Sequence, residues 1–316
     1  MVFVVTAYSV MGGLWSVTLT DAVQWVLIVL GLLVAIPFTI HYGGGWDAIM
    51  AKVPEEKLSV SEGIGWKTII SLTIMYIASF AVGQETVQRF YAARDEATAR
   101  VGSLLAGGAY LVFAFIPPVL GVLAYGLAQN GQLDVALIET EGTRYVLPVL
   151  AEAVLPSWLT GLVFAALISA TLSSADSDLL AAGSIFSNDI YSRYLRKGAD
   201  DREILKTTRL TMVAIAGLSM IVALTNTKSI VAILMFSFTL RAGGAFIPYV
   251  VGHYWRRASG AGCLASIFAG SVTVILAEHG MISSFGFGPI LPDLTASAVT
   301  YVLFSRLFPS PADPNK

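Results

Sequence analysis

Long apolar segments alternate with short polar stretches along the whole chain of 316 residues. A helix rises about 1.5 Å per residue, so roughly 20 apolar residues cross the ~30 Å hydrocarbon core of a bilayer. The segments lack the alternating polar and apolar positions of barrel strands, and a bilayer offers unpaired backbone groups no partner. The pattern therefore predicts an all-α membrane protein with eight complete transmembrane helices, at 18–40, 68–82, 101–127, 158–180, 210–224, 230–254, 261–277 and 294–308.

The N-terminal segment 2–10 is also apolar, but it is too short to cross a membrane. It lacks the basic region and the cleavage site of a signal peptide. We therefore expect this segment to be the end of a helix, so that one partial helix precedes the eight complete ones.

The composition agrees with a bilayer environment and excludes several classes of protein. Hydrophobic residues make up 56% of the chain and charged residues 13%, with a formal net charge of −2. Soluble domains carry about 25% charged residues, and they rarely expose large apolar patches. The composition thus excludes a soluble globular enzyme, a nucleic-acid binder and a disordered scaffold. The single cysteine, Cys263, and three separated histidines offer neither a disulfide framework nor a cluster of metal ligands.

Lysine and arginine residues concentrate in alternate connections between the predicted helices. Most of the 19 such residues follow the second, fourth, sixth and eighth apolar segments. Because cytoplasmic loops carry the excess of basic residues, we expect these connections in the cytoplasm. The sequence therefore predicts a multi-pass protein of the cell membrane with a cytoplasmic C-terminus. Since no polar linker divides the chain, we expect a single transmembrane domain over residues 1–316.

The fourth predicted helix carries polar residues that are unusual inside a membrane. One narrow face consists of Ala170, Ser173, Ser174 and Ser177, with Asp176 and Asp178 on either side. Small residues let another helix approach closely, which is one interpretation. The other is an ion site, because hydroxyl and carboxylate oxygens suit alkali or alkaline-earth ions, whereas Zn or Cu prefer His and Cys. A carboxylate in hydrocarbon costs about 3 kcal/mol or more. Helix packing does not explain two carboxylates, so the pattern favours the ion site.

Two further charged residues lie within predicted helices, and each allows two interpretations. Asp21 sits in the first turn of its segment, where it could interact with the helix macrodipole or bind a ligand. Arg241 lies beside Gly243 and Gly244 and ahead of Pro248, where backbone carbonyls lose their partners. It could reach a lipid or a carbonyl, or it could line a cavity and face an anionic group of a substrate. The residue pattern alone leaves both pairs of alternatives open.

Four stretches of the chain together resemble the sodium:solute symporter family, whose members carry sugars, proline, pantothenate, sialic acid and monocarboxylates with sodium. The family's eighth core helix is similar to AALISATLSSADSDLLAAGSIFSNDIY (165–191), and the signature entering its fifth core helix is similar to YSVMGGLWSVTLTDAVQ (8–24). The loop after its sixth helix is similar to GQETVQRFYAARDEATAR (83–100), and the end of its tenth helix to GAFIPYVVGHYWRR (244–257). The four motifs occur in the family's order and cover nearly the whole chain.

The resemblance implies a leucine-transporter-type fold of two inverted five-helix repeats, of which this chain holds only a part. On that basis residues 1–42 end the first repeat, 66–255 form the second, and 256–316 are accessory helices and a short tail. The chain is expected to begin near the end of the fourth core helix, as an N-terminally truncated fragment without the family's broken first helix. One source of the missing helices would be a separate polypeptide.

The resemblance also implies two sodium sites. The first sodium ion is expected at the backbone carbonyl of Ala170 and at the hydroxyls of Ser173 and Ser174. Members with a second sodium ion use the positions of Asp21, Ser173, Asp176 and Ser177. Asp176 stands where the family has a small hydroxyl residue, which would strengthen or reorganise this second site.

The family's substrate pocket implies a further set of residues on the second predicted helix: Tyr76, Ser79 and Phe80. Arg241 stands where small or neutral residues are more usual, which favours an anionic substrate. The implied function is sodium-coupled symport of a small organic solute, such as a sugar, an amino acid, a carboxylate or a vitamin. The coupling ion would be sodium, and the lipid bilayer would surround the helices.

Two other functions are compatible with a polar membrane bundle. A sensory module would bind the solute without moving it, although such modules carry a cytoplasmic signalling domain and only a short tail follows residue 308. A membrane aspartyl protease needs two aspartates on adjacent helices, whereas Asp176 and Asp178 share one helix. We therefore expect a transporter without catalytic residues, and a non-transporting solute sensor is the alternative.

Overall fold

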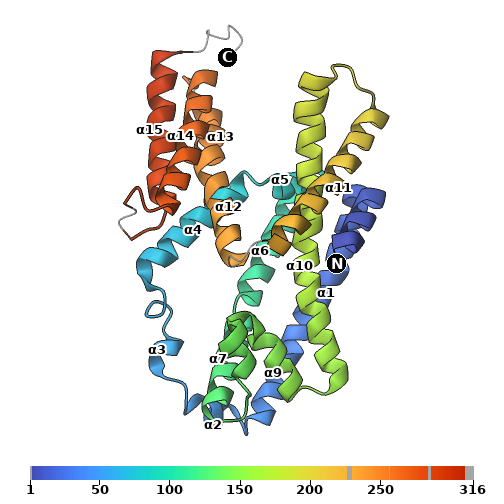
Figure 1. Cartoon of the computed structure of the whole chain (residues 1–316), viewed down its shortest axis with the longest axis vertical. Coiled ribbons are helices and arrows are strands. Elements are labelled where there is room, and N and C mark those ends of the chain that lie inside the picture. The colour runs from blue at the N-terminus through green and yellow to red at the C-terminus, as the bar shows by residue number, and fades with distance from the viewer. Residues whose placement is uncertain (1, 226–229, 256, 284–285, 310–316) are drawn as a thin grey trace. The chain divides into compact units, whose positions relative to one another are not determined.

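The computed structural model describes residues 2–225, 230–255, 257–283 and 286–309, and every regular element within those ranges is a helix (Figure 1). Six helical segments are long and apolar enough to cross a membrane: Val2–Tyr42, Glu96–Gln129, Ser157–Leu195, Asp201–Thr225, Val231–Tyr254 and Gly260–Glu278. A seventh crossing results if helices α4 (Gly65–Ala81) and α5 (Gln84–Tyr91), which bend by 49° at their junction, count as one span. The expected all-α membrane architecture is confirmed.

The predicted count of eight complete spans is not confirmed. The eighth predicted segment is a helix, α15 (Ile290–Leu307), but it is not among the candidate spans of the described residues. Asp293 and Arg306 contribute to this result, because both lie within the 18-residue helix and lower its mean hydropathy. The orientation in the membrane stays a prediction. Three of the basic residues counted for it, Lys228, Arg256 and Lys316, lie outside the described residues.

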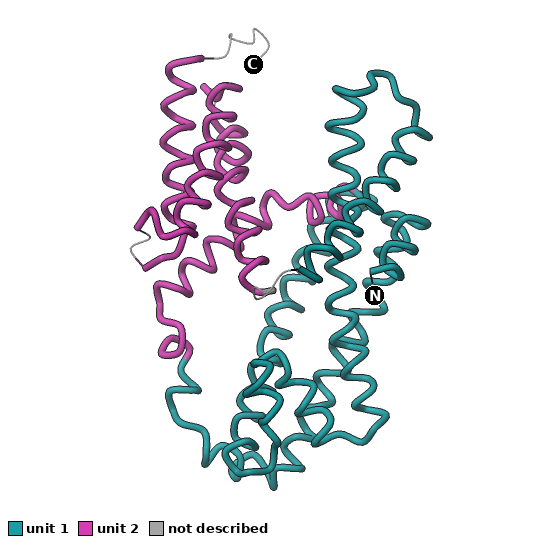
Figure 2. The backbone as a smooth tube through the Cα atoms, in the orientation of Figure 1, with its two compact units in different colours: residues 1–59, 92–225 teal, residues 60–91, 226–316 magenta. Residues whose placement is uncertain are grey.

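The chain packs into two compact units (Figure 2). Unit 1 contains Met1–Ser59 and Ala92–Thr225, and unit 2 contains Val60–Tyr91 and Asn226–Lys316. This packing does not test the single transmembrane domain or the repeat boundaries at 1–42, 66–255 and 256–316, which stay predictions.

Unit 1 is built on two long neighbouring helices, α1 (Val2–Tyr42) and α10 (Ser157–Ile185), which pack along each other. Helix α10 continues directly into a π-helical segment, η2 (Phe186–Leu195). The other helices of the unit are α2 (Trp46–Met50), α3 (Glu55–Leu58), α6 (Glu96–Phe113), α7 (Ile116–Gln129), α8 (Ala136–Glu141), the 3₁₀ helix η1 (Thr143–Tyr145), α9 (Val146–Val154) and α11 (Asp201–Thr225).

Helix α1 is interrupted at Gly13, whose backbone angles (φ 56°, ψ −144°) lie outside the helical region. A positive φ is readily adopted only by glycine, which explains the residue type at this position. The break separates a short N-terminal segment from a longer helix that continues to Tyr42. The break lies between the predicted apolar segment 2–10 and the predicted span at 18–40. That residues 2–10 are the end of a longer helix stays a prediction.

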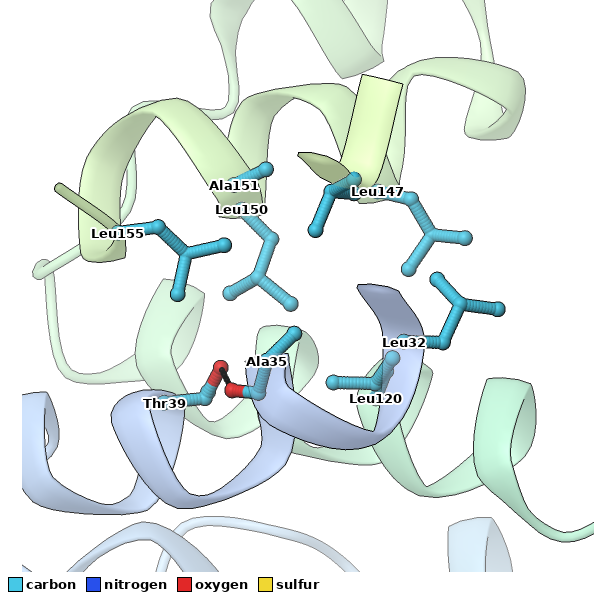
Figure 3. A pocket seen from close by; sticks show the side chains of 9 residues that line it. Leu32, Ala35, Thr39, Leu120, Leu147, Leu150, Ala151 and Leu155 are labelled. Carbon is cyan, nitrogen blue, oxygen red and sulfur yellow. Dashed lines mark hydrogen bonds between the residues drawn. The ribbon is translucent and has the colours of Figure 1, made fainter. Parts of the chain in front are cut away.

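The core of unit 1 brings α1 against α7, α9 and α10. Leu120 and Leu127 of α7 are fully buried there. A cavity of about 10 Å³, close to the smallest space that holds one water molecule, remains beside Leu32 and Ala35 of α1 (Figure 3). The hydroxyl of Thr39 in its wall donates to the carbonyl of Ala35 at 2.7 Å. The remaining lining is apolar, so this cavity is a small packing defect and not a site for a polar ligand.

Unit 2 is a bundle around the antiparallel pair formed by α14 (Gly260–Glu278) and α15. The bundle also contains α4, α5, α12 (Ile230–Arg241), the π-helical segment η3 (Ala242–Phe246) and α13 (Ile247–Tyr254). Segments α12, η3 and α13 follow one another without a loop. The π-helical turn coincides with Gly243 and Gly244, where the sequence predicts a perturbed helix.

Helices α14 and α15 meet along two buried stripes of residues spaced by four: Gly262, Ser266, Gly270 and Val274 on α14, and Asp293, Ser297, Tyr301 and Ser305 on α15. Rows with this spacing form the ridges along which helices interlock, and small residues let the two backbones approach closely. The hydroxyls of Ser266 and Ser297 share a hydrogen bond of 2.7 Å across the interface. Packing and hydrogen bonding thus act together in this pair.

The contact between α1 and α10 yields a test of the fold at Gly31. A β-carbon there would lie 2.9 Å from the Cβ of Ala166 on α10. We predict that Gly31→Leu lowers the thermal unfolding temperature of the purified chain in detergent, because overpacking costs about 1–3 kcal/mol. Gly217→Leu on α11 is the matched control, since Gly217 has open space around it and leucine gains up to ~1 kcal/mol of helix propensity. Equal unfolding temperatures for the two variants would contradict this packing.

Candidate functional site

The predicted ion-binding stripe of α10 begins with three oxygen atoms on one helical turn. The hydroxyls of Ser173 and Ser174 both donate to the carbonyl oxygen of Ala170, at 3.2 Å and 3.4 Å. Each hydroxyl oxygen keeps lone pairs after donating its proton, so the three oxygens can still face a cation. Ala170 and Ser174 are exposed within the described residues, and Ser173 is half-buried. This part of the stripe is therefore accessible to a ligand.

The stripe continues into a buried carboxylate that joins α10 to α1. Asp176 has 0% exposed surface, and its Oδ2 accepts a hydrogen bond of 2.6 Å from the hydroxyl of Tyr8 on α1. Its Oδ1 accepts a hydrogen bond of 3.2 Å from the hydroxyl of Ser177. The same hydroxyl lies 3.1 Å from the carbonyl of Ser173, one turn earlier. Asp176 thus links the two longest helices of unit 1, and Ser177 connects it to the backbone carbonyl of Ser173.

Asp21 lies on α1, the helix that packs along α10, but not at the position predicted for it. The helix that contains Asp21 starts directly after Gly13, so Asp21 is about two turns inside it and the prediction of a first-turn residue is wrong. The macrodipole interaction fades beyond the first turn of a helix. The interpretation of Asp21 as a helix-terminal acid therefore loses its basis, and its role as a ligand stays a prediction.

Two oxygen-bearing residues of α1 were not singled out from the sequence. Ser9 and Gln24 are buried, and Ser9 Oγ and Gln24 Oε1 have no hydrogen-bond partner among the described residues. Gln24 follows Asp21 by three positions, which places both on one face of the helix. That spacing, within the motif TDAVQ, was the signal that could have identified Gln24. Ser9 carries no such signal beyond its place next to Tyr8.

The predicted substrate residues all lie in unit 2 and gather where α4 meets α12. Tyr76 and Phe80 of α4 each pack against Phe238 of α12, with ring centroids 5.6 Å apart in both pairs. Ser79, between them on α4, is fully buried. Its hydroxyl accepts a hydrogen bond of 3.0 Å from Nε of Arg241. The structure therefore brings together four residues that the sequence assigned to one pocket.

Arg241 has a counter-charge that the sequence interpretation missed. Its Nη1 lies 2.6 Å from Oε1 of Glu85 on α5, and both side chains are largely buried. The guanidinium also lies over the ring of Phe238, 5.3 Å from its centroid. Neither alternative considered for Arg241 included this ion pair. An anionic substrate group would have to compete with Glu85, so the structure weakens the preference for an anionic substrate.

The chemistry of the α10 stripe suits a hard alkali or alkaline-earth cation. The atoms that could coordinate a cation are a backbone carbonyl oxygen, three serine hydroxyl oxygens and the carboxylate oxygens of Asp176. Within the part of the chain that the structure describes, no three His, Cys, Asp or Glu side chains group as ligands of a metal ion. Transition metals prefer nitrogen and sulfur ligands, whereas alkali ions accept neutral oxygens.

Comparisons with known proteins agree with this chemistry. Residues 1–270 match the model of the "Sodium:solute symporter family". The chain is 26% identical over 315 residues to the osmoregulated proline transporter OpuE of Bacillus subtilis (strain 168), covering 98% of this chain and 62% of the relative. It is 26% identical over 310 residues to the sodium/pantothenate symporter of Haemophilus influenzae, covering 95% of this chain and 62% of the relative.

A solved structure supports the fold in the same way. The chain superimposes with a TM-score of 0.77 on a Na+-coupled sialic acid symporter in a substrate-bound outward-open state, at 22% sequence identity. The match covers 98% of this chain and 66% of that protein. The chain thus spans less than two thirds of the length of the relatives it matches.

The hydrogen bond between Tyr8 and Asp176 yields a prediction for stability. Tyr8→Phe removes only the hydroxyl, and hydrogen bonds to charged groups contribute about 1.5–3 kcal/mol. We predict a matching loss in the free energy of unfolding in detergent. Tyr110→Phe is the control, because Tyr110 is 69% exposed on α6. A double-mutant cycle with Asp176→Ala, which removes the acceptor, measures the coupling directly, and a coupling energy near zero would show that the two helices are not joined by this bond.

The ion pair of Arg241 and Glu85 yields a second prediction. Glu85→Gln leaves a largely buried guanidinium without its counter-charge, so we predict a loss of about 1.5–3 kcal/mol in the free energy of unfolding. Glu141→Gln is the matched control, since Glu141 pairs with Arg144 at the surface and such pairs contribute about 0–1 kcal/mol. Equal losses in chemical unfolding of the two variants would refute the distinction between the buried and the exposed pair.

Proposed function

The chain belongs to the sodium:solute symporter family, and from that membership we propose that it supplies the C-terminal part of a sodium-coupled symporter for a small organic solute. The similar proteins are named as transporters of proline and pantothenate and as a symporter of sialic acid. Because the chain spans less than two thirds of their length, the activity belongs to the whole transporter in this proposal. The observation that carries it is the convergence of oxygen atoms on one turn of α10.

The first sodium ion is proposed at the carbonyl of Ala170 and the hydroxyls of Ser173 and Ser174. All three ligands are neutral oxygen atoms. A sodium ion bound there would therefore be coordinated without a carboxylate, and the occupied site would carry a single positive charge. The exposure of Ala170 and Ser174 leaves room for further oxygen ligands from another segment. In an intact transporter the family's broken first helix would supply them, so sodium would bridge that helix to α10.

The second sodium ion is proposed at Asp21, Asp176 and Ser177, with Ser173 between the two sites. Asp176 is fully buried and already oriented by Tyr8 and Ser177. A buried carboxylate is costly unless a cation compensates its charge. A sodium ion held next to Asp176 would provide that compensation and would stiffen the contact between α1 and α10.

The solute is proposed to bind against Tyr76, Ser79, Phe80 and Arg241. The aromatic rings offer an apolar surface, and the paired Arg241 and Glu85 offer both charges without a net charge. This surface fits an amino acid, a carboxylate, a vitamin or a sugar. Sodium would favour the conformation that binds solute, and binding of the solute would in turn raise the affinity for sodium, because linkage is reciprocal.

Sodium binding can be tested on the purified chain by thermal unfolding in detergent with NaCl or with KCl at equal ionic strength. Sodium at 100 times its dissociation constant should add about 2.7 kcal/mol to the free energy of unfolding. Combining Ser173→Ala and Ser174→Ala should reduce the difference between the two salts, leaving only the part that the second site contributes. Ser103→Ala is the matched control, because Ser103 on α6 donates to a backbone carbonyl in the same way, away from the stripe. Sodium stabilisation that is as large in the double variant as in the unmodified chain would refute the assignment of the first site.

A transport measurement tests the symport proposal itself. Membrane vesicles that contain the transporter should accumulate labelled proline, pantothenate or sialic acid when a sodium gradient is imposed, and not with a potassium gradient. An inside-negative potential should increase the uptake, because each inward charge gains ~2.3 kcal/mol per 100 mV. Uptake that is equal with both gradients would contradict coupling to sodium.

A further inference from the structure

The first turn of α15 contains a buried carboxyl group that the proposed sodium and solute sites do not use. Asp293 has 0% exposed surface, and neither of its oxygens has a hydrogen-bond partner among the described residues. This distinguishes Asp293 from Asp176, whose two oxygens both accept hydrogen bonds. An ionised carboxylate transferred to an apolar environment without a partner is strongly unfavourable.

The carboxyl group lies against the backbone of η3. A β-carbon at Gly243 would be only 2.7 Å from Oδ2 of Asp293, so the glycine is what allows this approach. Gly270 of α14 closely approaches the carbonyl of the same Gly243. Ile290, which precedes Asp293 by about one helical turn, packs in an apolar cluster with Ala242 and Met75. The contacts on this side of the carboxyl group are thus the glycine backbone of η3 and an apolar cluster one turn away.

No counter-charge compensates Asp293 within the described ranges. Segment η3 has no titratable side chain. The titratable residues on α15 and on the helices packed against it are Lys67 and Tyr76 on α4, Cys263 and Glu278 on α14, Tyr249, His253 and Tyr254 on α13, and Tyr301 and Arg306 on α15 itself. None of them forms a hydrogen bond with Asp293. The guanidinium of Arg241, directly before η3, is engaged by Glu85.

We infer that Asp293 is a proton-binding site, and that α15 packs against η3 only while this carboxyl group is protonated. A proton neutralises the charge without further ligands, whereas a metal ion needs several oxygens around it. Loss of the proton creates a charge that requires water, so the first turn of α15 must then separate from Gly243 or admit water. This site is distinct from the proposed sodium sites, and the inference does not rest on the proposed function.

Infrared spectroscopy of the full chain in detergent tests the protonation directly. The C=O stretching band of a protonated carboxylic acid is separate from the bands of carboxylates. We expect such a band at pH 7 in the wild-type chain and its loss in Asp293→Asn. Asp189→Asn is the control, because Asp189 is an exposed partner of Arg193 and its substitution should leave the band unchanged. A band that is equally strong in wild type and Asp293→Asn would overturn the inference.

The pH dependence of unfolding provides an independent readout. Between pH 5 and pH 8 the unfolded chain has already released the proton of this aspartate, whereas the buried carboxyl group of the folded chain holds its proton more strongly. The unfolded state then binds fewer protons, so stability falls as the pH rises. The unfolding temperature of the wild type should therefore decline more steeply over this range than that of Asp293→Asn. Parallel curves would overturn the inference.

A second variant keeps the test decisive if Asp293→Asn does not fold. Gly243→Ala places a methyl group against the carboxyl oxygen and should push α15 away from η3, so that water reaches the carboxyl group. We expect the protonated band at pH 7 to shift or disappear in this variant. An unchanged band would show that its source is another carboxyl group and would overturn the assignment to Asp293.

Discussion

The hydrocarbon core of a bilayer offers no water to a polar side chain, so each polar group buried in this chain needs a partner inside the protein. In unit 1 the carboxylate of Asp176 finds the hydroxyl of Tyr8, and in unit 2 the guanidinium of Arg241 finds Glu85 and Ser79. Each of these contacts joins two helices. The solvation of polar groups therefore also determines which helices are held together.

Small residues make these polar contacts possible because they let helix backbones approach one another. Gly31 brings α1 onto α10 in unit 1, and Gly243 and Gly270 bring η3 onto α14 and α15 in unit 2. Such close approach shortens the distance between side chains on facing helices, as the hydroxyls of Ser266 and Ser297 show. It also leaves less space for water, so polar groups at these interfaces depend on their protein partners.

The α10 stripe combines two electrostatic environments within a few residues. Ala170 and Ser174 offer neutral oxygens at an exposed position, whereas Asp176 is a charged group in the protein interior. A cation at the neutral oxygens leaves a net positive charge, and one at Asp176 compensates an existing negative charge. The two proposed sodium ions would therefore differ in their effect on the α1–α10 contact, although Ser173 and Ser177 connect their sites.

The features that depend on residue type and local spacing could be predicted from the sequence. Hydropathy predicted the helical membrane architecture, helical periodicity placed Ala170, Ser173 and Ser174 on one face, and four motifs indicated the family. The predicted count of eight spans was not confirmed. Hydropathy does not clearly classify a helix such as α15 as a membrane span, because Asp293 and Arg306 lower its mean value.

The partner of each buried polar group, in contrast, depends on long-range packing. Tyr8 and Asp176 are 168 positions apart, and Glu85 and Arg241 are 156 apart, so no local pattern connects either pair. The burial of Asp293 likewise depends on Gly243 of a different segment. Hydropathy and periodicity describe a residue and its own helix. The charge balance of a buried side chain depends on the neighbouring helix, and that neighbour is set by packing over the whole unit.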